Sequence, residues 1–414
     1  MRQSHTLRNT RRPIEPLRPT PLPASVRTAR VHPALLWAPF ALALVGLLFQ
    51  GSVGIAELGR LSREGAPPAV LDTLRPVLMQ ALWLLVGASV FWGCSRIRGR
   101  AWLASAWVWL LLSWGALVWL SLKLPGVLTL NGATRWLGAP VPMFGGITLQ
   151  PAEFYKLATL LWLTAMWSAP RLRPTVGWWL GGLLWFSGVA LIALQPDKDT
   201  AGLVFLLGFG VCFLGGLRAQ LVVLGVLAGG LLVGAVVATP LLLGALRDQP
   251  WETQPGAYVV KRMQATLDPW AHEREAGYQM VRAQIAVGSG GLLGVGLGVG
   301  REKRSLPAVE SDYIFAAIAE ETGLLGSALV MGLLGLLVWA CFQSAARAPT
   351  RAGRLYLAGL GAWIGIGALM NLSMAVGLLP TMGLPLPFVS AGGSALVSLM
   401  AAVGIGVALA RETQ

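Results

Sequence analysis

Apolar stretches of about 20 residues, long enough to cross a bilayer as helices, follow one another from residue 34 to the C-terminus. Of the 414 residues, 55% are hydrophobic and 12% are charged, whereas about 25% are charged in a soluble domain. The sequence therefore predicts an all-α membrane protein with about ten transmembrane helices in one domain, 34–414. The predicted spans are 34–56, 76–95, 102–122, 152–170, 176–194, 200–217, 221–246, 313–342, 355–378 and 394–410.

The net charge of +14 is distributed unevenly between the two sides of these spans. The termini and the turns on the same side are rich in arginine and contain only two acidic residues, Glu15 and Glu412. The opposite loops are nearly balanced in charge. Because basic residues accumulate on the cytoplasmic side of membrane proteins, both termini are predicted to be cytoplasmic. This topology accounts for the charge, so nucleic-acid binding is not expected.

Two polar regions flank or interrupt the spans. Residues 1–33 are rich in Arg, Pro and Thr and contain no apolar run, which predicts a disordered, basic cytoplasmic tail. Its charge could bind anionic lipid or remain solvated, and the sequence leaves both open. Residues 247–311, between the predicted helices 7 and 8, form a large extracytoplasmic loop of mixed charge. Loops of this length are uncommon unless they are functional, so we expect chemistry there.

Few ionisable residues are expected near the spans, where such groups are candidates for function. Glu153 and Lys156 are three residues apart on one helical face, which predicts a structural ion pair. Asp197 could bind a cation, but a role in holding its loop is favoured. Asp312 is predicted at the start of the eighth span. The helix dipole would stabilise a capping or first-turn carboxylate there, and a functional role is equally open.

Two segments rich in glycine or proline are too apolar for free loops. Residues 288–300, GSGGLLGVGLGVG, have dinucleotide-like glycine spacing but no preceding strand, which excludes a Rossmann motif. We expect a membrane-surface loop whose backbone must approach some other group closely. Residues 378–397 are predicted to be re-entrant and tucked between helices, because exposed loop backbone is not tolerated in lipid.

Eight motifs occur in the order found in the SEDS family (shape, elongation, division and sporulation), which includes FtsW, RodA and SpoVE. They are NGATRWL at 131–137, QPAEFYKL at 150–157, QPDKDT at 195–200, LDPW at 267–270, GYQ at 277–279, GSGGLLGVGLG at 288–298, SDYIFAAIAEETG at 311–323 and GLLPTMGLPLPFVSAGGSAL at 377–396. The chain resembles this family over about 34–410, and LDPW is more similar to FtsW than to RodA.

This resemblance implies a peptidoglycan glycosyltransferase of the bacterial cytoplasmic membrane that polymerises lipid II at the outer face, in cell division. The aspartate taken as catalytic in the family falls on Asp312. Its surroundings depart from the family motif, since Glu310 and Ser311 replace the usual His and Thr. A class B penicillin-binding protein transpeptidase and other division proteins are implied as partners.

The implied reaction should invert the configuration at the sugar carbon, which requires a base and stabilisation of the departing diphosphate. Asp312 is the candidate base, or it holds a divalent cation, Mg²⁺ or Mn²⁺, and the sequence does not decide between them. Arg262 is the preferred phosphate ligand because it matches the Tyr…Arg pattern that precedes LDPW in the family. The other candidate substrate ligands are Lys261, Arg282, Arg301, Lys303, Arg304, Glu320, Ser390 and Ser394.

Three other functions remain open from the sequence. A lipid II flippase would need polar groups continued through the bundle, a RodA-like polymerase would act in elongation, and a scaffold would only recruit proteins. Apart from Glu153 and Lys156, no charged pair is expected inside the first seven spans, which favours the enzyme over the flippase.

Overall fold

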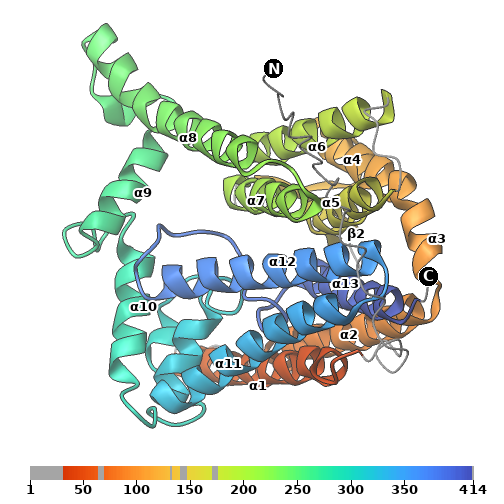
Figure 1. The fold of residues 1–414 in the computed structure, drawn as a ribbon. Helices are drawn as coiled ribbons and strands as arrows, with labels where there is room; N and C mark the ends of the chain where they lie inside the picture. The colour runs from red at the N-terminus through yellow and green to blue at the C-terminus, as the bar shows by residue number, and fades with distance from the viewer. Residues whose placement is uncertain (1–30, 64–69, 131–132, 140–146, 170–175, 413–414) are drawn as a thin grey trace, which may run out of the picture.

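The computed structural model describes residues 31–63, 70–130, 133–139, 147–169 and 176–412. The predicted tail lies almost entirely outside these residues. Within them the chain is mostly helical (Figure 1). The helices are α1 (Ala34–Arg63), α2 (Val70–Arg96), α3 (Gly99–Ala104), α4 (Ala106–Ser121), α5 (Pro151–Ser168), α6 (Val176–Leu194), α7 (Lys198–Gly215), α8 (Ala219–Arg247), α9 (Ala257–Leu267), α10 (Tyr278–Ser289), α11 (Ile314–Arg347), α12 (Arg351–Ala375) and α13 (Gly393–Arg411).

The prediction of an all-α membrane protein holds for the bundle. Eight of the described helices are long and apolar enough to cross a membrane: α1, α2, α6, α7, α8, α11, α12 and α13. α4 is apolar but has only 16 residues, and α5, with its ion pair, is not among the eight. The described residues therefore contain eight candidate spans by length and composition, against about ten spans expected from hydropathy.

Between α4 and α5 the chain forms a small antiparallel sheet that the sequence reading missed. Its strands are β1 (Val127–Leu130), β2 (Ala133–Ala139) and β3 (Ile147–Leu149), in the order β1-β2-β3. The pairs Leu128↔Trp136 and Leu137↔Leu149 set the register. Runs this short are hard to distinguish from loops by periodicity. The sheet matters because β2 carries Arg135.

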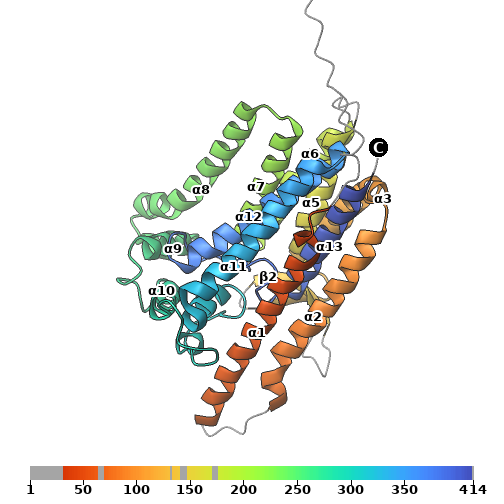
Figure 2. The ribbon, with the colours of Figure 1, turned by 60° about the horizontal axis from the view of Figure 1, so that its bottom comes forward.

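The bundle is densest around α13, which packs against α2 and α12. Figure 2 shows α1, α2, α11, α12 and α13 running alongside one another. Small residues allow these helices to approach closely: a Cβ on Gly404 would lie 2.5 Å from the carbonyl oxygen of Phe91. α8 differs, because its most apolar 18-residue window has no buried residue, and only Pro240 and Gly244 of this helix are buried within the protein. It extends along one side toward α9 (Figure 1).

The long segment 247–311 is structured, with 3₁₀ turns η2 (Trp251–Thr253) and η3 (Glu302–Arg304) beside α9 and α10. Its glycine-rich part lies against α11 at Gly323, where the helix is kinked with φ +63°. A Cβ on Gly290 would lie 2.0 Å from the Ala319 carbonyl oxygen. The expected close backbone approach is confirmed, and its partner is α11.

Residues 376–392 connect α12 to α13 without regular structure, yet they lie inside the protein. Leu384, Leu386 and Val389 are almost fully buried. The Asn371 side chain of α12 donates a hydrogen bond to the Leu384 carbonyl (2.7 Å). The predicted tucked segment is confirmed, and it reaches the predicted catalytic aspartate.

Candidate functional site

Asp312 lies just outside α11 and does not cap it. The N-cap is Tyr313, which makes no side-chain capping bond. A tight turn in which the amides of Ser311 and Asp312 donate to the Ala308 carbonyl ends one residue before the helix. The capping or first-turn role considered for Asp312 is therefore wrong. The residue is partly exposed, and its carboxyl is not used to cap the helix.

The backbone around Asp312 is held by three other elements. The Glu310 carbonyl accepts hydrogen bonds from the Gln50 side chain of α1 (2.9 Å) and the Ala391 amide (2.8 Å). The Ser390 hydroxyl donates to the Ser311 carbonyl. The Asn371 amide donates to the Asp312 carbonyl (2.8 Å). Three consecutive carbonyls are thus fixed, which orients the carboxyl side chain before any substrate binds.

The electrostatic surroundings of Asp312 link it to residues that are distant in sequence. The pKa of its carboxyl is raised to about 6, chiefly by burial. Nearby Asp199 and Asp197 also raise this pKa, whereas a hydrogen bond with Ser311 and the Arg135 charge lower it. Asp312 therefore shares one polar region with α7 and β2.

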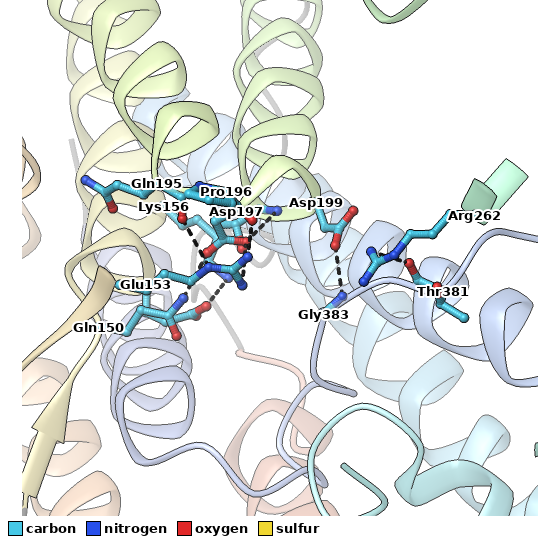
Figure 3. A network of polar contacts seen from close by, with 12 residues as sticks. Gln150, Glu153, Lys156, Gln195, Pro196, Asp197, Asp199, Arg262, Thr381 and Gly383 are labelled. Atoms are coloured by element: carbon cyan, nitrogen blue, oxygen red, sulfur yellow. Dashed lines mark hydrogen bonds and ion pairs between the residues drawn. The ribbon is translucent and has the colours of Figure 1, made fainter. Parts of the chain in front are cut away.

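Asp197 has the loop-holding role that the sequence favoured. It is the N-cap of α7, and its carboxylate accepts a hydrogen bond from the Thr200 amide (3.4 Å). The same side chain lies 3.7 Å from the Arg135 guanidinium and accepts a hydrogen bond from Gln150 (3.0 Å). Figure 3 shows this network at the start of α5 and α7.

Asp199 of α7 and Arg262 of α9 both bind the buried segment 376–392. The Asp199 carboxylate accepts a hydrogen bond from the Gly383 amide (2.9 Å), and Arg262 of α9 donates to the Thr381 carbonyl (3.0 Å; Figure 3). The sequence points to Arg262 but to neither Asp199 nor Arg135, although these two lie within the motifs QPDKDT and NGATRWL. Their role depends on the fold, which brings β2, α7 and the start of α11 together.

Glu153 and Lys156 form the predicted ion pair at 2.7 Å, and both are buried. Lys156 also lies 5.6 Å from the ring centroid of Trp363, and Ser398 donates to the Glu153 carbonyl (2.7 Å). A small cavity of about 20 Å³ adjoins the pair, enough for about one water molecule.

Four of the other predicted substrate ligands are buried with internal partners. Lys303 pairs with Glu321 and donates to Ser52 (2.7 Å), and Glu320 accepts from the amides of Arg301 (2.6 Å) and Glu302 (3.1 Å). Ser390 accepts from the Leu386 amide (2.8 Å), and Ser394 accepts from the Gln150 amide (2.9 Å). Their burial argues against direct substrate contact and indicates that they hold the loops around the site.

The basic candidates differ in how freely they can reach a ligand. Arg282 lies 3.5 Å from Glu302 and 3.8 Å from Glu273, so acidic neighbours already compensate its charge. Arg262 and Arg304 are exposed, and Lys261 is partly exposed. Arg262 is therefore the basic candidate that is both accessible and attached to the segment beside Asp312.

The donor set does not fit a metal held by the protein alone. Among the described residues, no three His, Cys, Asp or Glu side chains are grouped to bind a metal ion. Both carboxylate oxygens of Asp197 and one of Asp199 already accept hydrogen bonds.

The apolar helices define a polytopic membrane protein. It has a polar cluster suited to an ionic group, which consists of three aspartates and two arginines: Asp197, Asp199, Asp312, Arg135 and Arg262. Residues 40–414 match the family model of FtsW, RodA and SpoVE, described as cell cycle proteins. The chain belongs to this family.

Two relatives and two solved structures show how far the similarity extends. The chain is 35% identical over 389 residues to "Probable peptidoglycan glycosyltransferase FtsW" of Nitrosococcus halophilus, covering 92% of each chain. It is 34% identical to the protein of the same name from Hahella chejuensis, covering 94% of this chain and 92% of the relative. A solved peptidoglycan synthase complex, described as coordinating polymerization and crosslinking, contains a similar chain with TM-score 0.69 and 25% identity, covering 91% of this chain and 96% of that chain. Thermus thermophilus RodA shares the fold with TM-score 0.62 and 24% identity, covering 92% and 96%.

Proposed function

We propose that this chain is a peptidoglycan glycosyltransferase of the FtsW type, which polymerises lipid II at the outer face of the cytoplasmic membrane during cell division. The names of the relatives support the activity, and their similarity over nearly the whole chain supports its transfer. The observation that carries the proposal is the state of Asp312. The residue is partly exposed and is not used as a cap, and partial burial raises the pKa of its carboxyl to about 6.

Asp312 is suited to act as a general base in this reaction. A base is most effective when its pKa lies near the working pH, because it is then mostly ionised yet still accepts a proton readily. An ordinary aspartate, with a pKa of about 3.9, would be a much weaker base. We propose that Asp312 accepts the proton of the acceptor sugar hydroxyl as the hydroxyl oxygen attacks the anomeric carbon of the donor sugar. The bond from that carbon to the diphosphate oxygen breaks, and the lipid diphosphate leaves.

Arg262 is the proposed ligand of the lipid diphosphate. A guanidinium presents planar pairs of donors that match phosphate oxygens. Arg262 uses one donor on Thr381, which fixes its position and leaves other donors free for a ligand. Arg135 is compensated by Asp197, so its proposed role is to tune the charge of the site. A single displacement at an α-linked sugar diphosphate would give the inverted, β-linked product.

A divalent cation is proposed only as a companion of the substrate. Mg²⁺ is commonly bound through one or two carboxylates together with substrate phosphates. Asp312 is the proposed carboxylate for that purpose, and the base role does not require the ion. Removal of Mg²⁺ and Mn²⁺ with EDTA, followed by addition of each ion, measures the requirement.

The proposed orientation places both termini in the cytoplasm. The described turns at one end of the bundle contain Arg98, Arg218 and Arg351, whereas Glu412 is the only acidic residue that the structure describes in them. Basic residues favour the cytoplasmic side. The site around Asp312 lies at the opposite ends of α7 and α11, which is then the outer face. A class B penicillin-binding protein is the proposed partner, supported by the similarity to a chain of the synthase complex.

A flippase is the main alternative, and the placement of charges disfavours it. Buried Glu153 and Lys156 form an ion pair with an N–O distance of 2.7 Å. The pair lies at the start of α5, near the proposed outer face. Purified protein with lipid II in detergent separates the two functions, since no second compartment exists there. An enzyme makes glycan strands, visible by gel electrophoresis. A flippase makes none but moves fluorescent lipid II across vesicle membranes, and that outcome would contradict the proposal.

A further inference from the structure

The glycine-rich segment 290–299, between α10 and η3, exposes an unusual set of side chains. Leu292, Leu293 and Leu297 are 69%, 76% and 57% exposed, although they belong to a loop outside the helices. Val295 and Val299 are also exposed, and the segment contains no charged residue. In water such a surface would favour aggregation, so an apolar partner is expected.

The backbone of this segment is bonded to α11, which limits its freedom. The amides of Val295 and Gly296 donate to the carbonyls of Glu320 (2.9 Å) and Glu321 (3.1 Å). In the other direction, the amides of Leu324 and Leu325 donate to the carbonyls of Gly291 (2.9 Å) and Leu292 (3.2 Å). The kink at Gly323 opens the helix, and the segment satisfies polar groups that the kink releases.

These bonds place the exposed side chains beside the outward face of α11. Leu324, Leu325 and Leu329 are 55%, 62% and 62% exposed on a helix that is long and apolar enough to span a membrane. The loop surface is therefore continuous with a face that lipid must cover. Contact with lipid is enough to explain the exposed apolar side chains of the segment.

The height of the segment along α11 agrees with the edge of the bilayer. α11 ends at Arg347, a basic residue of the proposed cytoplasmic side. From Leu324 to Arg347 the helix rises roughly 34 Å, at about 1.5 Å per residue. The hydrocarbon core is about 30 Å thick, so a moderately tilted α11 places Leu324 at its outer boundary.

We propose that segment 290–299 inserts its leucine and valine side chains into the outer leaflet and anchors the extracytoplasmic region in lipid. Four of its amides, those of Gly294, Val295, Gly296 and Val299, have protein acceptors. These bonds lower the cost of placing the backbone at the edge of the apolar core, where headgroups and water reach the other amides. Because the segment is bonded to the turn of α11 at 320–325, the anchor also fixes the height of the short helical stretch that follows Asp312.

Spin labelling of the full-length protein in phosphatidylglycerol nanodiscs tests this proposal. A nitroxide on Leu293→Cys is compared with labels on Leu329→Cys, on the lipid side of α11, and Glu275→Cys, an exposed polar position of the same extracytoplasmic region. The native cysteines are buried, and the unsubstituted protein gives the labelling background. We expect oxygen to relax the Leu293 label as strongly as the Leu329 label, with an oxygen-to-nickel-chelate accessibility ratio several-fold above that at Glu275.

Two outcomes would overturn the proposal. If the nickel chelate relaxes the Leu293 label as strongly as the Glu275 label, the segment lies in water. If neither reagent reaches it, protein covers the segment, for example in a second copy of the chain. Both readings are independent of enzymatic activity.

Discussion

At the scale of residues, the Asp312 carboxyl is subject to opposing electrostatic influences. Burial and the Asp199 and Asp197 charges favour its protonated form, whereas Arg135 and Ser311 favour the ionised form. The balance raises the pKa to about 6, which in the proposed mechanism places the proton transfer near neutral pH. The pH dependence of the reaction therefore reports on this group.

Polymerisation should fall as the pH decreases through about 6, because a protonated Asp312 cannot accept a proton. Asp199→Asn removes a negative neighbour and should move the half-maximal rate to lower pH. Arg135→Gln removes a positive neighbour and should move it to higher pH. Initial rates from pH 4.5 to pH 8 would measure these shifts. Shifts of the same sign in the two variants would contradict the proposed charge balance.

Asn371→Leu should slow the reaction without preventing folding. The variant removes the hydrogen bonds to the carbonyls of Asp312 and Leu384, so the carboxyl loses part of its support. Misplacement by about 1 Å can reduce a rate by about 100-fold, and a ten- to hundredfold fall in kcat is expected. The measurement is kcat and KM for lipid II, with unchanged elution in size-exclusion chromatography as the folding control. An unaltered kcat would show that this support is dispensable.

At the scale of elements, the kink in α11 depends on two glycines, Gly323 of the helix and Gly294 of segment 290–299. Gly323 has φ +63°, and a Cβ there would lie 2.4 Å from the Gly294 amide nitrogen. The kink and the bonds from segment 290–299 therefore require both glycines. A residue with a side chain would be strained and would push the segment away.

Gly323→Ala is expected to lower the midpoint of thermal unfolding in detergent by several degrees or to reduce the yield of folded protein. Gly332→Ala is the matched control, because it lies in the same helix with nothing within 4 Å of its added Cβ. That change should be neutral or slightly stabilising, since alanine favours helix by about 1 kcal/mol. Equal melting temperatures for the two variants would contradict the assigned role of Gly323.

Hydropathy predicted the long helices well because a lipid-spanning helix has a strong signal of length and composition. α8, predicted at 221–246, is observed at Ala219–Arg247. The strands β1–β3 were missed because they are short, and the partners of Asp312 were missed because charge coupling depends on tertiary placement. The sequence also could not show that Lys303 and Glu320 are buried, since their spacing alone allows exposure.

At the scale of the whole molecule, the buried core of the helix bundle and the polar cluster around Asp312 occupy different regions. α13 and its neighbours form the buried core, whereas the polar cluster lies where β2, α7, α9 and segment 376–392 converge on Asp312. The predicted tail, 1–33, lies almost entirely outside the described residues. Deletion of the tail therefore tests its contribution to catalysis separately from that of the bundle.

Deletion of residues 1–30 should leave polymerisation within about twofold of the full-length rate, because the sequence predicts a disordered tail with no part in the site. The deletion retains His32, whose amide donates to Ser344 (3.1 Å). The same lipid II assay on both proteins measures the effect. Loss of activity in a folded, truncated protein would give the tail an essential role.

The most direct measurement is glycan-strand synthesis from purified lipid II by Asp312→Ala protein beside the unsubstituted protein. Glu275→Gln, which removes an exposed carboxylate outside the site, is the matched control. The account predicts that Asp312→Ala makes no strands while it inserts and elutes normally, and that Glu275→Gln retains the full rate. Strands of normal length and yield from Asp312→Ala would contradict it.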